Sequence, residues 1–220
     1  MLRTYPRFVT IEGGEGAGKT TVLRALRDAL AADGDEVVCT REPGGTPLAE
    51  LIRGLLLDPG HEPAHPDTEL LLIFAARAQH VQETILPALE RGAWVISDRF
   101  TDSSYAYQGG GRGIDPARIA ALEAAHVGIA PAITLLLDLG VAQGRERARG
   151  RDASPDRIEA EQDAFFERVR SAFLARAQAE PQRIRVIDAT RSADVVAADA
   201  VQALQAARHL QLQASHGSVE

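Results

Sequence analysis

The sequence predicts an α/β fold in which a five-stranded parallel sheet is flanked by helices on both faces. Short apolar runs alternate along the 220 residues with longer segments of helical spacing. The apolar runs are nearly continuous, as in parallel strands that are buried on both sides. A glycine-rich segment directly follows the first run. A chain of this length is sufficient for one such domain, which we expect over residues 1–208.

Strands are predicted where β-branched and other apolar residues gather without a break. The segments are 7–12, 36–40, 93–97, 133–139 and 184–188. Ligands of such folds bind outside the carboxyl ends of the strands. The polar residues predicted at those ends are Glu12, Arg41, Asp98 and Asp138.

Helices are predicted where apolar residues recur at intervals of three and four. The segments are 19–32, 46–57, 67–90, 101–108, 115–127, 141–149, 161–179 and 192–207. We expect Asp67 or Thr68 to cap the long helix at 67–90, and the run Gly109 to Gly111 to end the helix before it. Residues 209–220 are polar and are expected to form a disordered tail.

The composition excludes several classes of protein. The 24 basic and 31 acidic residues give a net charge of −7, whereas binding to duplex nucleic acid needs a basic surface. The single cysteine, Cys39, cannot form an internal disulfide or a cysteine-built metal site. The longest apolar run, Leu70 to Ala76, is far shorter than the ~20 residues of a membrane span. We therefore expect a cytoplasmic protein without nucleic-acid or membrane partners.

The segment after the first predicted strand fits the phosphate-binding pattern G-x-x-x-x-G-K-[ST] without a gap. Its glycines let backbone N–H groups turn toward phosphate oxygens, and the helix that follows adds the positive end of its dipole. Lys19 is the only lysine among the 24 basic residues, which indicates a site for a compact ammonium at the β- and γ-phosphates. The Thr20 hydroxyl is a ligand for Mg²⁺. The residues predicted to bind the triphosphate are Gly13, Gly14, Glu15, Gly16, Ala17, Gly18, Lys19 and Thr20.

A bound nucleoside triphosphate leaves open which molecule receives the phosphate. The chain has no N-K-x-D motif for guanine, and 220 residues are few for a motor or a helicase. The residues favour a small kinase, and the alternative from another class is a nucleotide-binding regulatory module without turnover.

A second set of residues can serve the chemistry and the acceptor. Asp98 can hold a magnesium-bound water or orient the acceptor, and Arg99 offers a two-pronged contact to a phosphate. Phe74 and Arg77 lie three residues apart on one predicted helix, where a ring and a guanidinium can hold a nucleobase. Further turn, aromatic and amide groups lie in 41–46 and 105–108.

Five segments, in their order along the chain, resemble those of the bacterial thymidylate kinase family. They are GGEGAGKT (13–20), TREPGGT (40–46), VISDRF (95–100), AYQGGGRGID (106–115) and DRIE (156–159). The likeness covers about residues 7–205. It implies a P-loop kinase core, transfer of the γ-phosphate of ATP to dTMP with Mg²⁺, and a homodimer. The runner-up is another nucleoside monophosphate or deoxynucleoside kinase on the same core.

The resemblance also implies how dTMP is held at its phosphate and sugar. Arg53 and Arg99 correspond to residues that hold the dTMP phosphate. Glu15 corresponds to a residue near the sugar 3′-hydroxyl. Tyr107 corresponds to a residue that packs at C2′ and disfavours a ribose, and Gln108 lies nearby.

For the base, the resemblance implies that Arg77 and Ser104 read the thymine edge. The family's stacking phenylalanine sits four residues before that arginine, where this chain has Ile73, while Phe74 sits three residues before it. Both positions border the same helix face, so we expect Phe74 to stack on the base.

Arginines are crowded in a segment that we predict to be a lid, over about 145–160. They are Arg145, Arg147, Arg149, Arg151 and Arg157. Phosphoryl transfer needs positive charge on the migrating group. Some thymidylate kinases carry an arginine inside the P-loop, where this chain has Gly16, so we expect the lid to supply the charge. The residues left open for this role are Arg149, Arg151 and Arg157.

Overall fold

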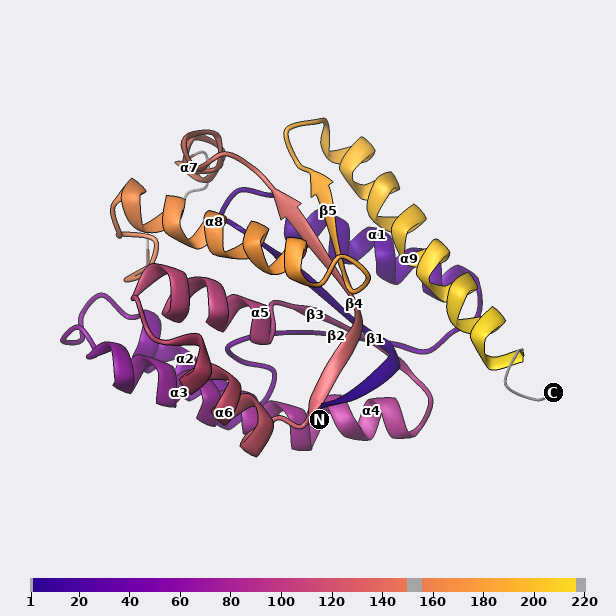
Figure 1. The fold of residues 1–220 in the computed structure, drawn as a ribbon, viewed down its shortest axis with the longest axis horizontal. Coiled ribbons are helices and arrows are strands. Elements are labelled where there is room, and N and C mark those ends of the chain that lie inside the picture. Colours follow the sequence, from indigo (N-terminus) through magenta and orange to yellow (C-terminus); the bar gives the residue numbers. More distant parts are fainter. Residues whose placement is uncertain (1, 150–155, 217–220) are drawn as a thin grey trace.

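The structure is a computed structural model that describes residues 2–149 and 156–216, with the side chains of all of them except 149 and 210–216. One parallel sheet with the strand order β2-β3-β1-β4-β5 forms its centre (Figure 1). The strands are β1 (Arg3–Gly13), β2 (Val37–Arg41), β3 (Trp94–Asp98), β4 (Ile129–Asp138) and β5 (Ile184–Asp188). The predicted fold class is therefore confirmed.

Helices cover both faces of the sheet (Figure 1). The helices are α1 (Lys19–Ala32), α2 (Pro47–Leu57), α3 (Pro66–His80), α4 (Leu86–Glu90), α5 (Thr101–Ser104), α6 (Pro116–His126), α7 (Val141–Arg149), α8 (Asp163–Ala179) and α9 (Ala193–His216). Two π-helical segments, η1 (Val81–Ile85) and η2 (Tyr105–Gly111), continue α3 and α5. None of the described helices has the length and apolar character that a membrane crossing requires.

Side chains alternate between the two faces of β1, which separates the core into layers. Val9 and Ile11 pack with Leu26 of α1 and Leu204 of α9. Phe8 points to the opposite face, where it packs with residues of α3, η1 and α6. Because helices bury both faces of the sheet, its strands are nearly continuous apolar runs in the sequence.

Several element ends differ from the prediction. The helix at 67–90 begins at Pro66, and the ring of His65 caps it by accepting a hydrogen bond from the Asp67 N–H at 3.3 Å. β4 begins at Ile129, four residues earlier than expected, because its first residues pair with the start of β1. α9 continues to His216, so residues 209–216 are helical and the expected disordered tail is wrong over that stretch.

The three glycines at 109–111 do not end the helix, as had been expected, because η2 runs through them. They allow α8 to lie close instead. A Cβ on Gly110 would come within 2.6 Å of the Ala172 Cβ, and one on Gly111 within 2.5 Å of the Phe165 ring. The close packing of η2 on α8 fixes the residues that η2 presents to the edge of the sheet.

Candidate active site

The loop between β1 and α1 turns so that α1 begins at the carboxyl edge of the sheet. Gly16 and Gly18 have φ angles of 72° and 94°, in the left-handed region that glycine adopts without strain. The first N–H groups of α1 therefore face the space beyond the strands, where an anion is stabilised. Lys19 Nζ donates to the carbonyl oxygens of Gly13 (3.4 Å) and Gly14 (3.0 Å), which keeps the ammonium over the loop.

Two adjoining cavities open at this edge of the sheet. The first, beside the P-loop, has a volume of about 1380 Å³ that is partly open to solvent. The second has a volume of about 750 Å³, also partly open to solvent, and is lined by residues of α2, α3, α5, η2 and α8. The residues that line both are Glu15, Glu42, Arg53, Arg99 and Glu159. The two cavities thus form one cleft with three glutamates and two arginines at the junction.

The first cavity brings together Gly16, Gly18, Lys19, Thr20 and Asp98. One carboxylate oxygen of Asp98, Oδ1, is buried and has no hydrogen-bond partner among the described residues. Such an oxygen is a suitable ligand for a hard cation or its bound water. Of the other predicted P-loop residues, Gly13 and Gly14 line a separate hollow behind the loop, and Ala17 is buried in the core.

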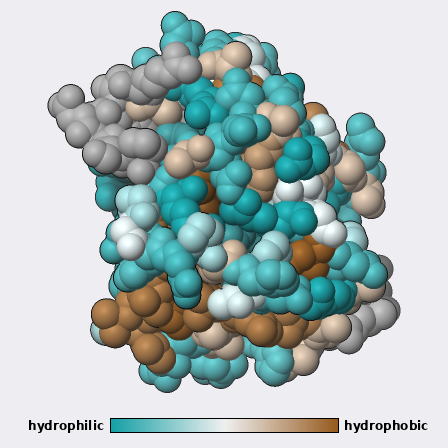
Figure 2. Space-filling view, turned by 90° about the vertical axis from the view of Figure 1, so that its left-hand side faces the viewer, coloured by the Kyte–Doolittle hydropathy of each residue, from teal (hydrophilic) through white to brown (hydrophobic). Residues whose placement is uncertain are grey.

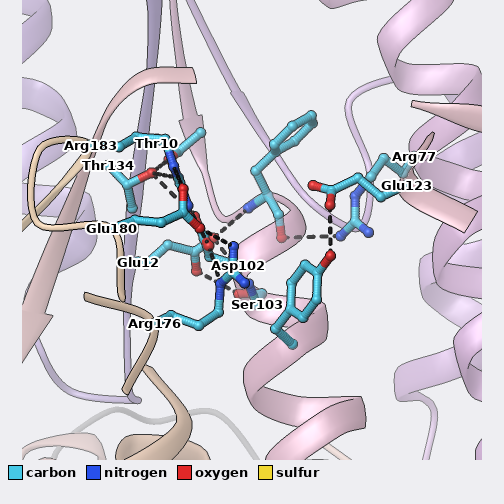
Figure 3. Close-up of polar contacts among 12 residues, drawn as sticks. Thr10, Glu12, Arg77, Asp102, Ser103, Glu123, Thr134, Arg176, Glu180 and Arg183 are labelled. Atoms are coloured by element: carbon cyan, nitrogen blue, oxygen red, sulfur yellow. Dashed lines mark hydrogen bonds and ion pairs between the residues drawn. The ribbon is translucent and has the colours of Figure 1, made fainter. Parts of the chain in front are cut away.

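The second cavity is lined by Arg53, Arg77, Ser104, Tyr107 and Gln108, the residues that the resemblance associates with dTMP. Arg77 is nearly inaccessible to solvent, and hydrogen bonds fix its guanidinium. Its Nη1 donates to Ser104 Oγ at 2.9 Å. Its Nη2 donates to the Phe100 carbonyl at 3.1 Å (Figure 3). Arg53 Nη1 donates to the Pro43 carbonyl at 2.9 Å. Burial lowers the pKa of Arg53, and the charge of Arg41 adds to this effect.

Glu42 is a residue of this site that the sequence analysis missed. Its carboxylate accepts hydrogen bonds from Arg77 Nε at 2.6 Å and contacts His80 Nδ1 at 3.0 Å. Burial alone would raise the pKa of Glu42, but the charge of Arg77 and the hydrogen bond from His80 hold it below its usual value. The segment REPGGT was interpreted as a turn and as part of the family resemblance, and nothing local in it indicates a partner 35 residues further on.

The predicted stacking role of Phe74 is not supported by its position. Phe74 is 3% exposed and packs in the core with Phe8 and Phe100. Ile73 lines the second cavity in its place, because a shift of one residue turns the side chain by about 100° around a helix. The aromatic ring that does line this cavity, besides that of Tyr107, is Phe166 of α8.

Tyr107 lines the second cavity, and its ring packs against the aromatic side chains of α8. It packs against Phe173 edge to face with 6.2 Å between the ring centres, and the guanidinium carbon of Arg99 lies 5.0 Å from its ring centre. Gln108 is turned toward α3, where its Nε2 donates to Glu69 Oε1 at 2.9 Å. Its amide therefore serves Glu69 as well as the cavity.

The predicted lid arginines divide into different environments. Arg157 lines neither cavity, because its guanidinium donates to Glu69 Oε2 (2.7 Å) and to the Leu56 carbonyl (2.7 Å). Arg149 ends α7, and its side chain lies outside the described part, as does Arg151 altogether. Arg147 lines the first cavity although it was not among the three candidates.

Comparisons with known proteins agree on one family. The family model described as thymidylate kinase matches residues 11–200. A thymidylate kinase of Pseudomonas fluorescens is 60% identical over 185 residues, which are 84% of this chain and 88% of the relative. One of Chromohalobacter salexigens is 57% identical over 197 residues, 89% of this chain and 93% of the relative. The crystal structure of thymidylate kinase from Ehrlichia chaffeensis superposes with a TM-score of 0.74 at 34% identity, covering 92% of this chain and 99% of that one.

Proposed function

The chain belongs to the thymidylate kinase family and transfers the γ-phosphate of ATP to dTMP, giving dTDP and ADP, and we propose that the two adjoining cavities hold these two substrates. The observation that carries this assignment is the junction at Arg99, which lines both cavities. A phosphate donor on one side and an acceptor on the other would meet at its guanidinium. Holding both reactants in this way supplies the proximity on which phosphoryl transfer depends.

ATP binds through its phosphates in the first cavity. Backbone N–H groups of residues 13–18 and the start of α1 surround the phosphates, and Lys19 reaches the β- and γ-phosphates. A third cavity of about 680 Å³ continues from Gly16 and Arg147 to Ser192 and Val196 at the start of α9. This position beside the phosphates and its partly apolar lining suit the adenine base.

dTMP binds in the second cavity with its phosphate toward Arg99 and Arg53. Arg77 and Ser104, which line this cavity, face the thymine edge. Glu42 and the Phe100 carbonyl fix the Arg77 guanidinium in that position. Tyr107 forms the wall at the sugar, and Glu15 lies near its 3′-hydroxyl.

Mg²⁺ is the cofactor that we propose for the reaction. Thr20 and Asp98 share the first cavity, and the unpartnered Oδ1 of Asp98 fits a magnesium-bound water. The described residues contain no cluster of three His, Cys, Asp or Glu able to hold a metal. We propose that the ion is held by the oxygens of Thr20 and Asp98 together with phosphates and water. The bound ion would neutralise charge on the phosphates.

Positive charge on the transferred phosphate comes from the lid, with Arg147 as the first candidate. Its Nη1 donates to the Ala189 carbonyl at 2.9 Å, and its side chain lies at the cavities proposed for phosphates and adenine. Arg149 and Arg151 remain candidates from the sequence. Arg157 instead fixes the base of the lid through Glu69.

A coupled assay of ADP release with dTMP, dUMP, dCMP and AMP as acceptors tests the substrate assignment. We expect dTMP to have by far the highest kcat/KM, and comparable values for AMP or dCMP would favour a different monophosphate kinase. Lys19→Ala should abolish turnover with the fold intact, and Lys19→Arg should fail because a planar fork does not suit a point-charge site. Wild-type ADP release by a folded Lys19→Ala protein would disprove the P-loop assignment.

We further propose that residues 1–208 act as one domain in the cytoplasm, where ATP is available, and that two copies form a homodimer. Leu48, Leu51 and Leu55 of α2 and Leu71 of α3 are 51%, 69%, 55% and 57% exposed. Figure 2 shows apolar surface gathered along the lower part of the face that it presents. Single exposed leucines are common, whereas four on two packed helices form a patch typical of an interface.

Sedimentation tests the dimer. The wild-type protein should sediment as two chains at micromolar concentration, and Leu51→Glu should shift it to one. Val195→Glu is the matched control, because Val195 of α9 is also exposed, at 40%, and lies outside the patch. A wild-type protein that sediments only as one chain would refute the interface.

A further inference from the structure

Arg99 occupies an unusual backbone conformation at the end of β3. Its φ is 71°, in the left-handed region, where a side chain with a Cβ is strained. Residues held in this way persist only when the surrounding structure fixes them, and they occur often at functional sites.

Backbone and side-chain contacts fix the turn from both sides. The Arg99 N–H donates to the Ile11 carbonyl at 2.9 Å, and Ser97 Oγ donates to the Arg99 carbonyl at 2.7 Å. The next N–H, that of Phe100, donates to Oε1 of Glu12 at 2.8 Å. Glu12 therefore holds the residue that follows the strained position.

The same carboxylate contacts Ser103 (Figure 3), and Ser103 in turn contacts the Arg99 side chain. The Ser103 hydroxyl donates to Glu12 Oε2 at 2.6 Å, and the Ser103 N–H donates to Oε1 at 3.2 Å. Arg99 Nη1 in turn donates to Ser103 Oγ at 3.2 Å and to the Gly13 carbonyl at 3.1 Å. Ser103 Oγ is thus a bridge between a buried carboxylate and the guanidinium at the junction of the cavities.

Ser103 is itself anchored by its neighbour on α5. Asp102 accepts hydrogen bonds from Arg176 Nε at 2.6 Å and from Arg183 Nη1 at 2.7 Å, which ties α5 to α8 and to the start of β5 (Figure 3). Burial alone would raise the pKa of Asp102, but hydrogen bonds and charge from Arg183 and Arg176 hold it below its usual value. The ion pairs of Asp102 keep the bridging hydroxyl in place.

Glu12 differs from Asp102 in having no ion pair with any described lysine or arginine. It is inaccessible to solvent, and its acceptors are met by two N–H groups and one hydroxyl. A buried carboxylate without a paired cation is costly to the fold, so packing alone does not explain it. Each of its three contacts leads instead to the turn that carries Arg99.

We propose that Glu12 and Ser103 are positioning residues for phosphoryl transfer, which hold the Arg99 guanidinium at the junction of the two cavities. The inference rests on the proposed function in that Arg99 is the group that contacts phosphate. Neither the Glu12 carboxylate nor the Ser103 hydroxyl need touch substrate for this role.

Ser103→Ala removes the bridge and leaves the two N–H contacts of Glu12. We expect kcat/KM for dTMP to fall by about tenfold or more, mostly in kcat, since small displacements of a catalytic group are costly. Ser103→Thr keeps the hydroxyl and should restore most of the rate. Glu12→Gln reverses the hydrogen bond to Ser103 and should lower kcat in the same way. Ser171→Ala is the control, because Ser171 is an exposed residue of α8 outside the cleft.

Arg99→Ala separates this inference from the proposed function. If Arg99→Ala keeps wild-type turnover, Arg99 does not contact phosphate and the proposed site is wrong at that residue. If Arg99→Ala is inactive while folded Ser103→Ala and Glu12→Gln keep wild-type kcat, the positioning role is overturned and the proposed site stands. A loss in Ser103→Ala that Ser103→Thr does not repair would also overturn it, because the hydroxyl would then not be the cause.

Discussion

Arg77 and Glu42 form an ion pair of 2.6 Å in which the two side chains are only 2% and 3% exposed. Glu42→Ala leaves the guanidinium buried without its carboxylate, which typically costs about 3–5 kcal/mol of stability. The KM for dTMP should rise as well, because Arg77 loses the contact that orients it toward Ser104. Urea unfolding and a dTMP titration measure the two effects. Glu36→Ala is the control, because the Glu36–Arg91 pair is exposed and should contribute at most about 1 kcal/mol.

The lid arginines should separate kinetically. Arg147→Ala should lower kcat far more than it raises the KM for ATP, as expected for a contact made mainly in the transition state. Arg157→Ala should mainly reduce the free energy of unfolding, because it removes a hydrogen bond to the buried Glu69. Steady-state kinetics of alanine variants at 147, 149, 151 and 157 decide between them. A near-normal kcat in all four variants would show that the lid does not supply positive charge to the transferred phosphate. Arg99 would then be the next residue to test for that role.

Tyr107 should determine the preference for deoxyribose. Tyr107→Ala should lower the ratio of kcat/KM for dTMP to that for ribo-TMP, since the ring that excludes a 2′-hydroxyl is gone. Tyr107→Phe keeps the ring and should keep the ratio. Removing a ring that packs on Phe173 also costs about 3–5 kcal/mol, so the unfolding free energy must be measured on the same samples. An unchanged ratio in a folded Tyr107→Ala protein would show that the tyrosine serves only the core.

Glu12 should make stability fall with rising pH. Burial, and secondarily the charge of Asp102, raises the pKa of Glu12 from 4.5 to about 7. Between these values the folded state binds more protons than the unfolded state, so the contribution of Glu12 to stability decreases as pH rises through this window. Relative to Glu12→Gln, the wild-type protein should lose roughly 3 kcal/mol between pH 4 and pH 8. Chemical unfolding of both proteins over that range measures the difference, and a constant difference would contradict the raised pKa.

The parallel sheet and its five strands could be anticipated because each strand is a short apolar run next to a helix of regular period. The glycines at 109–111 could not be interpreted correctly from local sequence. Glycine breaks a helix by propensity, yet η2 continues through them because α8 lies too close for side chains. Tertiary packing against α8, which cannot be seen in the local sequence, therefore determines that η2 continues through these glycines.

The same distinction holds at the cleft. Asp98 ends β3, Arg99 follows it, and Lys19 begins the helix after the loop that follows β1, so the predicted sheet edge was enough to bring them together. Phe74 was misplaced because residues 70–74 are all apolar, and such a run does not show which side chain faces a cavity. Glu42 and Ser103 act through partners distant in the chain, and the geometry of those contacts appears only once the chain is folded.

The backbones of the P-loop and α7 touch at Gly16 and Gly144. A Cβ on Gly16 would collide with the Gly144 carbonyl, and one on Gly144 would come within 2.5 Å of the Glu15 carbonyl. An arginine inside the P-loop, as some family members have, therefore cannot be introduced at position 16 while α7 stays where it is. Replacing Gly16 and moving α7 are therefore coupled changes in this chain: a side chain at position 16 needs a displaced helix.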